Sequence, residues 1–100
     1  MQRWVFLVFF LVSIVSIAAD VRSGKDIYEQ YCITCHQDGL LGAPRFHDKG
    51  DWSPRMSQKT IDELVTSSLK GLNAMPSQGT CSDCTEAEMK SAIEYMVSDK

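Results

Sequence analysis

The sequence lacks an excess of positive charge, and it lacks any uninterrupted apolar run long enough to cross a bilayer comfortably. Lys and Arg number 10 against 13 Asp and Glu, which gives a formal net charge of −3. This balance argues against a nucleic-acid partner. No Ser/His/Asp triad or pair of carboxylates with a hydrolytic arrangement is recognisable, and neither repeats nor low-complexity segments occur. No strand pattern of useful length is present either.

The N-terminus carries an export signal. A short positive start ending at Arg3 is followed by an uncharged apolar stretch, which is shorter than the roughly 20 residues of a membrane span. Small residues follow at the positions that a signal peptidase inspects. We therefore predict a signal peptide over residues 1–18, with cleavage after Ala18 or Ala19, and a single periplasmic domain over residues 19–100. An uncleaved segment that anchors this domain to the membrane is the alternative.

The most informative motif is Cys32-Ile33-Thr34-Cys35-His36. The pattern C-x-x-C-H is the attachment sequence of c-type haem. Its two thiols add across the two vinyl groups of one haem, and its histidine supplies an axial nitrogen to the iron. Cys32 and His36 are four residues apart, so that on a helical turn they face the same side. In an exported chain, the added histidine favours haem over a redox dithiol or half of a zinc site.

A covalent haem would also stabilise a domain that is otherwise small for an independent hydrophobic core. Removal of residues 1–18 leaves 100 − 18 = 82 residues with 9 basic and 13 acidic side chains, a net charge of −4. A domain this small buries only about 60–65% of its unfolded surface and usually needs an additional stabilising element. We expect the haem to supply the apolar centre around which the helices pack.

Three helices are predicted from capping residues and apolar periodicity. The first begins at about Ser23 and continues into the haem motif. The second begins with the capping box at Thr60 and stops at Gly71, and the third begins with the capping box at Thr85 and carries an apolar stripe as far as Val97. The fold class expected is all-α, with three main helices and long loops wrapped around one haem.

The stretch between His36 and Thr60 is predicted to be a loop. Residues that interrupt regular structure are spread along it. A long structureless segment is unusual in a small domain, but it becomes intelligible if it follows the edge of a haem. These interrupting residues are Gly39, Gly42, Pro44, Gly50 and Pro54.

Met75 is the predicted sixth ligand of the iron. It directly precedes Pro76, which keeps this segment extended and could present a thioether sulfur rigidly. Met89 and Met96 lie on the apolar stripe of the last predicted helix, where core packing is expected, and Met56 lies in a polar stretch. A buried methionine that only fills a gap is the alternative interpretation of Met75.

His47 is the only histidine besides His36. It is therefore the only candidate for a bis-histidine site. Because it lies in a polar loop close in sequence to His36, we predict an exposed loop histidine rather than a ligand.

The pair Cys81 and Cys84 is followed by Thr85 and so lacks the histidine of an attachment motif. In an oxidising compartment two cysteines this close are expected to pair as a disulfide. A catalytic dithiol would require a thioredoxin-like alternation of strands and helices, which is absent. A four-cysteine zinc site is disfavoured because the two pairs lie about 45 residues apart, against roughly 15–20 in zinc ribbons.

These features together resemble class I bacterial cytochromes c, most closely the small soluble cytochrome c-five group. The resemblance covers nearly the whole chain after the signal peptide. Besides the haem motif and the second cysteine pair, the stretches that carry it are Gly24-Lys25-Asp26-Ile27-Tyr28, Gly42-Ala43-Pro44-Arg45-Phe46, Trp52-Ser53-Pro54-Arg55 and Lys70-Gly71-Leu72-Asn73-Ala74-Met75-Pro76.

The resemblance implies a specific packing around the haem. The N- and C-terminal helices should cross, with Gly24 and Tyr28 meeting the last helix near Ile93 or Tyr95. The Pro44 carbonyl should accept a hydrogen bond from the far ring nitrogen of the axial histidine.

The same resemblance places Trp52 and Arg55 near the haem propionates. It implies nothing for His47, which is not part of the family's motifs. On this basis we expect these two side chains to belong to the surroundings of the haem.

The function that follows is a monohaem electron carrier whose iron is ligated by His36 and Met75. Its partners would be a redox donor and a redox acceptor, each bound transiently, and it would contact a membrane only if residues 1–18 stay attached. We do not expect an enzyme. The alternatives are a haem enzyme or ligand sensor with an open sixth site, and a cytochrome module of a larger dehydrogenase complex.

Overall fold

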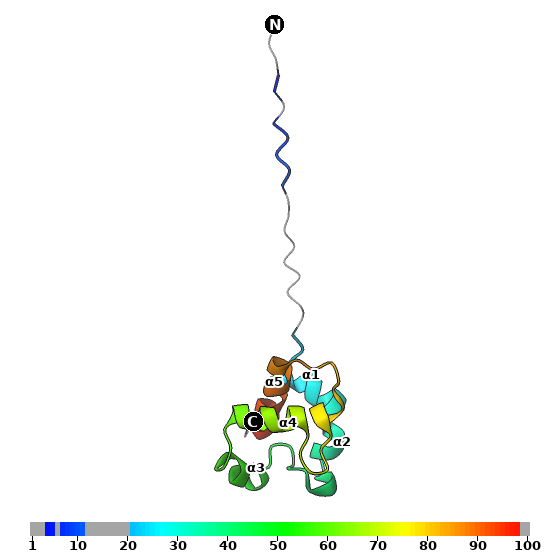
Figure 1. Ribbon diagram of the computed structural model, residues 1–100, viewed down its shortest axis with the longest axis vertical. Helices are drawn as coiled ribbons and strands as arrows, with labels where there is room; N and C mark the ends of the chain where they lie inside the picture. Colours follow the sequence, from blue (N-terminus) through cyan, green and yellow to red (C-terminus); the bar gives the residue numbers. More distant parts are fainter. Residues whose placement is uncertain (1–3, 6, 12–20, 99–100) are drawn as a thin grey trace.

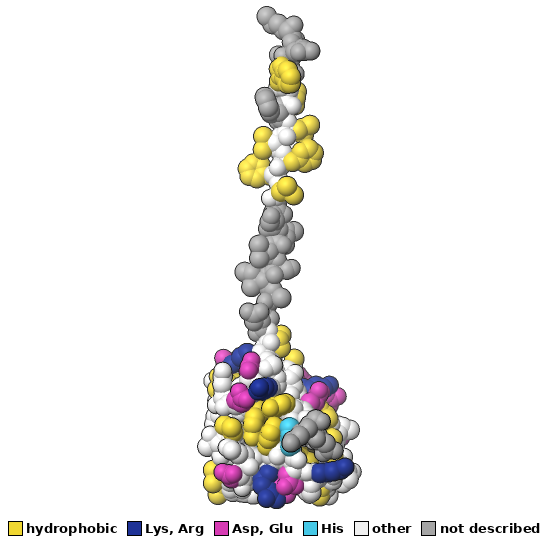
Figure 2. Space-filling model, turned by 180° about the vertical axis from the view of Figure 1, so that it is seen from behind, with side chains coloured by type: hydrophobic (Ala, Val, Ile, Leu, Met, Phe, Trp, Pro, Cys, Tyr) yellow, Lys and Arg dark blue, Asp and Glu magenta, His cyan; other side chains and the backbone are white. Residues whose placement is uncertain are grey.

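The computed structural model describes residues 4–5, 7–11 and 21–98, and its folded part is a helical domain that begins after residue 20 (Figure 1). The predicted signal peptide falls mostly outside the described residues. Where it is described, its large apolar side chains are exposed (Figure 2). Among the described residues, no helix has the length and apolarity needed to span a membrane.

The described domain is built from helices and connecting loops, without a named β-strand, and this agrees with the all-α prediction. The two longest helices, α4 and α5, lie in the second half of the chain, and shorter helical segments precede them (Figure 1). In chain order the elements are α1 (Gly24–Ile27), the π-helical segment η1 (Tyr28–Cys32), α2 (Ile33–His36), the 3₁₀ turn η2 (Leu40–Gly42), α3 (Lys49–Met56), α4 (Ile61–Lys70), the 3₁₀ turn η3 (Ser77–Thr80) and α5 (Glu86–Val97).

The predicted helix starts are confirmed by their caps. The Ser23 hydroxyl oxygen accepts the Asp26 N–H at 3.1 Å at the start of α1. Capping boxes form at Thr60 before α4 and at Thr85 before α5, and α4 ends at Gly71. Local hydrogen bonding at these positions thus determines where each helix begins.

The first predicted helix is present but irregular, because Tyr28–Cys32 winds as a π-helix between α1 and α2. Such wide turns occur inside α-helices, frequently at functional sites. Here the wide turn ends at Cys32, the first residue of the haem motif, and the Tyr31 carbonyl accepts the Thr80 hydroxyl at 3.3 Å. The irregular segment is thereby joined to the loop that follows Met75.

The prediction of a continuous loop between His36 and Thr60 is wrong at α3. Asp48 caps this helix by accepting the Asp51 N–H at 3.0 Å. Pro54 lies inside the helix and removes one donor, but burial of Trp52, which is 5% exposed, stabilises the helix against the core. The Asp48 cap and the burial of Trp52 therefore stabilise this helix although Gly50 and Pro54 lie inside it.

The crossing of the chain's first and last helices organises the core. A Cβ atom at Gly24 would lie 2.1 Å from the Ser91 carbonyl oxygen, so only glycine allows α1 and α5 to approach this closely. Tyr28 also meets the last helix, with its ring edge-on to Tyr95 at 5.7 Å. The crossing that the resemblance implied is therefore present, and Gly24 meets α5 at Ser91 and Ala92, next to the expected Ile93. The core beneath it contains Ile27, Val65, Met89, Ala92, Ile93 and Met96.

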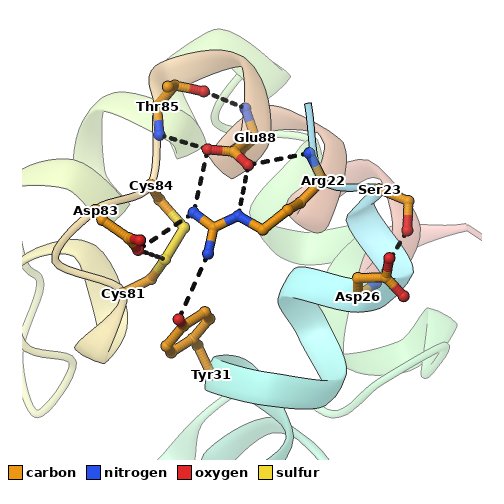
Figure 3. A network of polar contacts seen from close by, with 9 residues as sticks. All are labelled: Arg22, Ser23, Asp26, Tyr31, Cys81, Asp83, Cys84, Thr85 and Glu88. Atoms are coloured by element: carbon orange, nitrogen blue, oxygen red, sulfur yellow. Dashed lines mark hydrogen bonds and ion pairs between the residues drawn. A yellow bond between two sulfur atoms is a disulfide. The ribbon is translucent and has the colours of Figure 1, made fainter. Parts of the chain in front are cut away.

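A partly buried ion pair lies beside this crossing (Figure 3). The side chain of Glu88 is 6% exposed, and its Oε2 accepts the Arg22 Nε–H at 2.7 Å and the Arg22 backbone N–H at 3.1 Å. Arg22 also reaches Asp83 at 3.2 Å, in the turn between Cys81 and Cys84. The hydrogen bond from Arg22, helped by the Thr85 N–H, lowers the pKa of Glu88 to about 2. The network ties the segment before α1 to the start of α5.

Candidate haem site

A mostly apolar cavity opens between α2, α4, α5 and the loop that follows α4. Its walls include the haem motif and the predicted sixth ligand, although these are separated by about forty positions in the sequence. Apolar side chains from every neighbouring element complete it. The site residues in its lining are Cys32, Cys35, His36, Trp52, Arg55 and Met75, and the apolar residues include Ile27, Leu64, Met89, Ile93 and Met96.

Cys32 and Cys35 are half-buried thiols that are not joined to each other. Both line the cavity, one at the end of the π-helical segment and the other on α2. Burial, together with the proximity of Cys35, raises the pKa of Cys32 to about 11. Cys32 is therefore an uncharged, apolar group at neutral pH, and it can be covered by a flat apolar ligand without desolvating a thiolate.

His36 ends α2 and is 7% exposed. Its Nδ1 lies 2.7 Å from the Pro44 carbonyl oxygen, which can only accept, so that Nδ1 carries the proton. The remaining ring nitrogen, Nε2, is then an unprotonated donor of an electron pair. The ring is also held by Trp52, whose plane is within 16° of parallel at a centroid distance of 6.2 Å. This is the tautomer that a metal-ligating imidazole requires.

The segment that carries the Pro44 carbonyl is fixed by α3. The indole N–H of Trp52 donates to the Arg45 carbonyl at 2.8 Å. The Arg45 Nε–H donates to the Asp51 carboxylate at 2.8 Å, and this hydrogen bond holds the pKa of Asp51 below its usual range. The helix that sequence reasoning missed therefore positions the hydrogen-bond acceptor of His36.

Met75 reaches the cavity from the loop after α4. Leu72 and Met75 exchange backbone hydrogen bonds of 3.0 and 2.9 Å, which close a tight turn. Gly71 has φ +91°, a conformation in which a side chain is strained, and it lets the chain leave α4 into this turn. At Gly79 an added Cβ atom would lie 2.9 Å from the Met75 methyl group. The methionine is thus held in place by a turn and by close packing at its tip.

The remaining methionines differ from Met75 in their positions. Met89 and Met96 are buried on α5, as predicted, and they also line the cavity. Met56 is half-buried at the end of α3 and packs against the core away from the cavity. Met75 is the methionine that comes from a loop rather than from a core-facing helix.

His47 lies in a turn and away from the cavity, as predicted, but the prediction that its side chain is exposed is wrong. The side chain is half-buried, and its Nε2 lies 2.9 Å from the Tyr95 carbonyl oxygen near the end of α5. Its ring stacks on Phe46 at a centroid distance of 3.6 Å. His47 does not line the cavity, so it is a packing contact between its loop and α5 and not a ligand. Its polar sequence neighbours concealed this long-range contact.

Cys81 and Cys84 form a disulfide in the structure, with their Cα atoms 5.4 Å apart. Cys81 is 1% exposed and contributes to the cavity wall. With their sulfurs joined, these residues are not thiolates, so a four-cysteine zinc site does not fit this arrangement.

Trp52 and Arg55 lie at the cavity, but their donors already have partners. The Trp52 N–H is bonded to Arg45, and the exposed Arg55 guanidinium donates to the Asp51 carbonyl at 2.6 Å. A guanidinium has five N–H donors. Arg55 therefore keeps donors for a carboxylate at the cavity rim, whereas the single indole donor does not.

The groups around the cavity fit a covalent haem. Two thiols and an imidazole with an unprotonated Nε2 come from adjacent turns, and a thioether comes from a separate loop. Thiols of this spacing hold the macrocycle, and imidazole with thioether is an established axial pair for haem iron. The apolar lining suits the flat face of the ring.

The comparisons with known proteins agree with this site. Residues 19–96 match the family described as cytochrome C oxidase, cbb3-type, subunit III. Cytochrome c5 of Azotobacter vinelandii is 49% identical over 76 residues, which are 75% of this chain and 92% of that protein. The chain belongs to the cytochrome c family. As a cytochrome c it binds a covalent haem c, and it is a small monohaem electron carrier rather than an enzyme.

Solved structures of cytochromes c share the fold. A mono-haem ferrocytochrome c from Shewanella putrefaciens superposes with a TM-score of 0.68 at 46% identity, covering 78% of this chain and 95% of that one. A cytochrome c in an electron-transfer complex with nitrite reductase gives a TM-score of 0.69 at 36% identity, covering 74% and 89%. The all-α, class I cytochrome c fold predicted from the sequence is therefore confirmed.

Proposed function

We propose that this cytochrome c carries single electrons with an iron held by His36 and Met75 and a macrocycle bound through Cys32 and Cys35. The observation that carries the proposal is the meeting of these four side chains at one apolar cavity. Haem c supplies a one-electron couple when it is bound. The chain's own residues then determine how that couple is held and which proteins reach it.

His36 contributes a fixed, electron-rich nitrogen. The Pro44 carbonyl accepts its Nδ1–H at 2.7 Å, and the ring is buried. This hydrogen bond sets the tautomer and raises the basicity of Nε2. Because the ring cannot turn without breaking that bond, the ligand stays in place in both oxidation states, and little structural change accompanies electron transfer.

Met75 contributes a soft neutral ligand that is already positioned by its turn. The Leu72–Met75 backbone hydrogen bonds and the packing of Gly79 against the methyl group limit its motion. A methionine ligand raises the reduction potential relative to two nitrogen ligands. The chain therefore suits a carrier late in a respiratory chain, and a ligand-filled sixth site does not suit a peroxidase or a gas sensor.

The mouth of the cavity supplies a surface for brief encounters. Leu40, Leu41 and Leu72 lie on the cavity rim and are 50, 79 and 49% exposed. An apolar rim that surrounds the redox group can contact a partner over a small area, which is typical of weak redox encounters. The related cytochrome c in its complex with nitrite reductase supports a protein donor and acceptor as transient partners.

The compartment is proposed to be the periplasm, reached through the signal peptide predicted at residues 1–18. Covalent haem attachment and a Cys81–Cys84 disulfide both suit an exported, oxidising location. If residues 1–18 are retained, the same domain would be anchored at the membrane. Mass spectrometry of the protein from its own host would distinguish the two by the mass of this segment.

The ligand assignment is tested by leucine replacements, which keep side-chain volume close to that of methionine. The ferric wild type should be low-spin, with the weak far-red absorption band of a methionine–iron bond, and the ferrous protein should bind carbon monoxide poorly. Met75→Leu should remove the band, permit carbon monoxide binding and lower the potential.

Met89→Leu and Met56→Leu are the matched controls for this test. Met89 lines the cavity but belongs to the core-facing side of α5, and Met56 lies away from the cavity. Both variants should keep the far-red band. Retention of the band in Met75→Leu, or its loss in Met89→Leu, would refute the assignment of Met75. A wild type that binds carbon monoxide rapidly would instead indicate an open sixth site.

A further inference from the structure

The segment from Pro44 to His47 forms hydrogen bonds both with the end of α2 and with the end of α5. At one side, the Pro44 carbonyl accepts the His36 Nδ1–H at 2.7 Å, and the Phe46 N–H donates to the His36 carbonyl at 2.7 Å. At the other side, the His47 N–H donates to the Met96 carbonyl at 2.9 Å. The position of the Pro44 carbonyl therefore depends on the attachment of this short segment to α5 as well as on its hydrogen bonds to α3.

The side chain of His47 provides a second attachment to the same helix. Its Nε2 lies 2.9 Å from the Tyr95 carbonyl oxygen, so Nε2 carries a proton and donates. The Ser98 hydroxyl donates to the same carbonyl at 3.0 Å. The backbone at His47 has φ +55°, in the left-handed region that non-glycine residues seldom adopt. The two hydrogen bonds that His47 makes to α5, from its backbone N–H to Met96 and from its Nε2 to Tyr95, hold the segment in this uncommon conformation.

Stacked rings reinforce this attachment. Phe46 lies between His47, at a centroid distance of 3.6 Å, and Tyr28, at 4.5 Å, and it is nearly parallel to both. Tyr95 lies at an angle to all three rings, at 5.6 Å from His47, 5.1 Å from Phe46 and 5.7 Å from Tyr28. Offset-stacked and edge-on arrangements of this kind are favourable. The ring of His47 is thus the outer layer of a stack that extends to the first helical segment.

We propose that His47 is a positioning residue for electron transfer: through the Phe46 stack and the Tyr95 carbonyl it holds the Pro44 carbonyl against His36 and so keeps the reduction potential low. The inference rests on the proposed role of His36 as an axial ligand. A strong hydrogen bond to Nδ1 makes the imidazole a better electron donor, which favours the oxidised iron. Loosening the segment weakens that bond and favours the reduced iron.

The test uses the holoprotein with His47→Asn. Asparagine tolerates positive φ, so the backbone conformation is kept while the ring and its reach to Tyr95 are removed. We expect the ratio of reduced to oxidised protein at a fixed solution potential to rise about threefold, which corresponds to about 28 mV when a tenfold change is 59 mV for one electron. The His36 Nδ1 proton, followed by nuclear magnetic resonance, should exchange with solvent faster, and the far-red band should remain.

Ser98→Ala is the matched control, because Ser98 donates to the same Tyr95 carbonyl and lies 3.5 Å from His47 Nε2, but it takes no part in the stacking of the rings. Its potential should equal that of the wild type. An unchanged potential and an unchanged Nδ1 exchange rate in His47→Asn, even with lower thermal stability, would overturn the proposal and leave His47 a structural contact. If His47→Asn does not yield holoprotein, His47→Gln keeps a donor at similar reach without the ring, and the same two measurements decide.

The two proposals fail separately. Absence of the far-red band from the wild type would refute Met75 as the sixth ligand. The difference in potential and in Nδ1 exchange between wild type and His47→Asn would still decide whether His47 positions the histidine.

Discussion

Replacement of Gly24 by alanine tests whether the contact between α1 and α5 is as close as the structure indicates. The new Cβ atom would lie 2.1 Å from the Ser91 carbonyl oxygen and 2.5 Å from its carbonyl carbon. Both are backbone atoms, which cannot move aside as a flexible side chain can. The two helices must therefore separate by about 1 Å, a gap that forfeits about a quarter to a half of the dispersion energy of the atom pairs across it.

The size of the effect follows from the residues at this crossing. Ile27 and Ala92 are fully buried and Ile93 is 2% exposed. Separation of the helices therefore weakens the packing contacts of these buried side chains. Overpacking of such a core costs typically about 1–3 kcal/mol, and we expect the upper end of this range because the clash is with backbone. A loss of about 3 kcal/mol lowers the Tm of a domain this size by about 12–24 °C.

The assay is thermal unfolding of the oxidised holoprotein followed by circular dichroism. Gly50→Ala is the control, because Gly50 lies in the first turn of α3 and the nearest atom to its added Cβ would be the side-chain Oδ1 of the capping Asp48 at 3.3 Å, a contact that requires a shift of only a few tenths of an ångström. There the gain in helix propensity, at most about 1 kcal/mol, offsets this small adjustment, and the Tm should stay close to that of the wild type. A Gly24→Ala variant that melts within 2 °C of the wild type, within the precision of such melts, would show that the helices are not in close contact.

Three further outcomes are expected. Haem should stay attached to wild-type protein on a denaturing gel, and Cys32→Ala combined with Cys35→Ala should abolish this retention; haem that is extracted intact from the wild type would contradict thioether attachment. Titration of the denatured, unreduced holoprotein should find no free thiol, and replacing Cys81 and Cys84 by serine should lower stability by about 2 kcal/mol at most without changing the haem spectrum. The pKa of Glu88 is about 2 in the folded protein, against 4.5 ordinarily. Its contribution to the free energy of unfolding is therefore fully present above pH 4.5 and is lost as the pH falls toward 2. Glu88→Gln should therefore flatten the decline in unfolding free energy over that window, and an unchanged acid profile would show that the carboxylate is not held by charge.

The helix boundaries could be predicted because their causes are local. Ser23, Thr60 and Thr85 each accept an N–H from the residue three positions ahead, and that pattern is visible in the sequence. The haem motif is also local, since its residues lie within one helical turn. For these features, no knowledge of the rest of the fold was needed.

The features that sequence reasoning missed depend on contacts between distant parts of the chain. The helix α3 was hidden by Gly50 and Pro54, although Asp48 three residues before Asp51 was an available capping signal. The partners of His47 lie 48 and 49 positions away on α5, which no local pattern reveals.

The Arg22–Glu88 pair was missed for a similar reason, with a separation of 66 positions. In the sequence Glu88 reads as the acidic residue of a capping box, and this role is present, because it accepts the Thr85 N–H at 3.0 Å. The same carboxylate also holds Arg22. A residue that satisfies a local rule can carry a second, long-range role that the rule does not disclose.

The crossing of α1 and α5 also bears on how late the domain can complete its fold. Gly24 and Ala92 touch across 92 − 24 = 68 positions, so nearly the whole domain must be made before this contact can close. Contacts of such long sequence separation form slowly, because the entropy of closing the loop must be overcome first. Until α5 arrives, one side of the cavity is missing and the turn containing Cys32 is open to other molecules. Because α5 comes last along the chain, both thiols of the haem motif stay accessible until that helix docks.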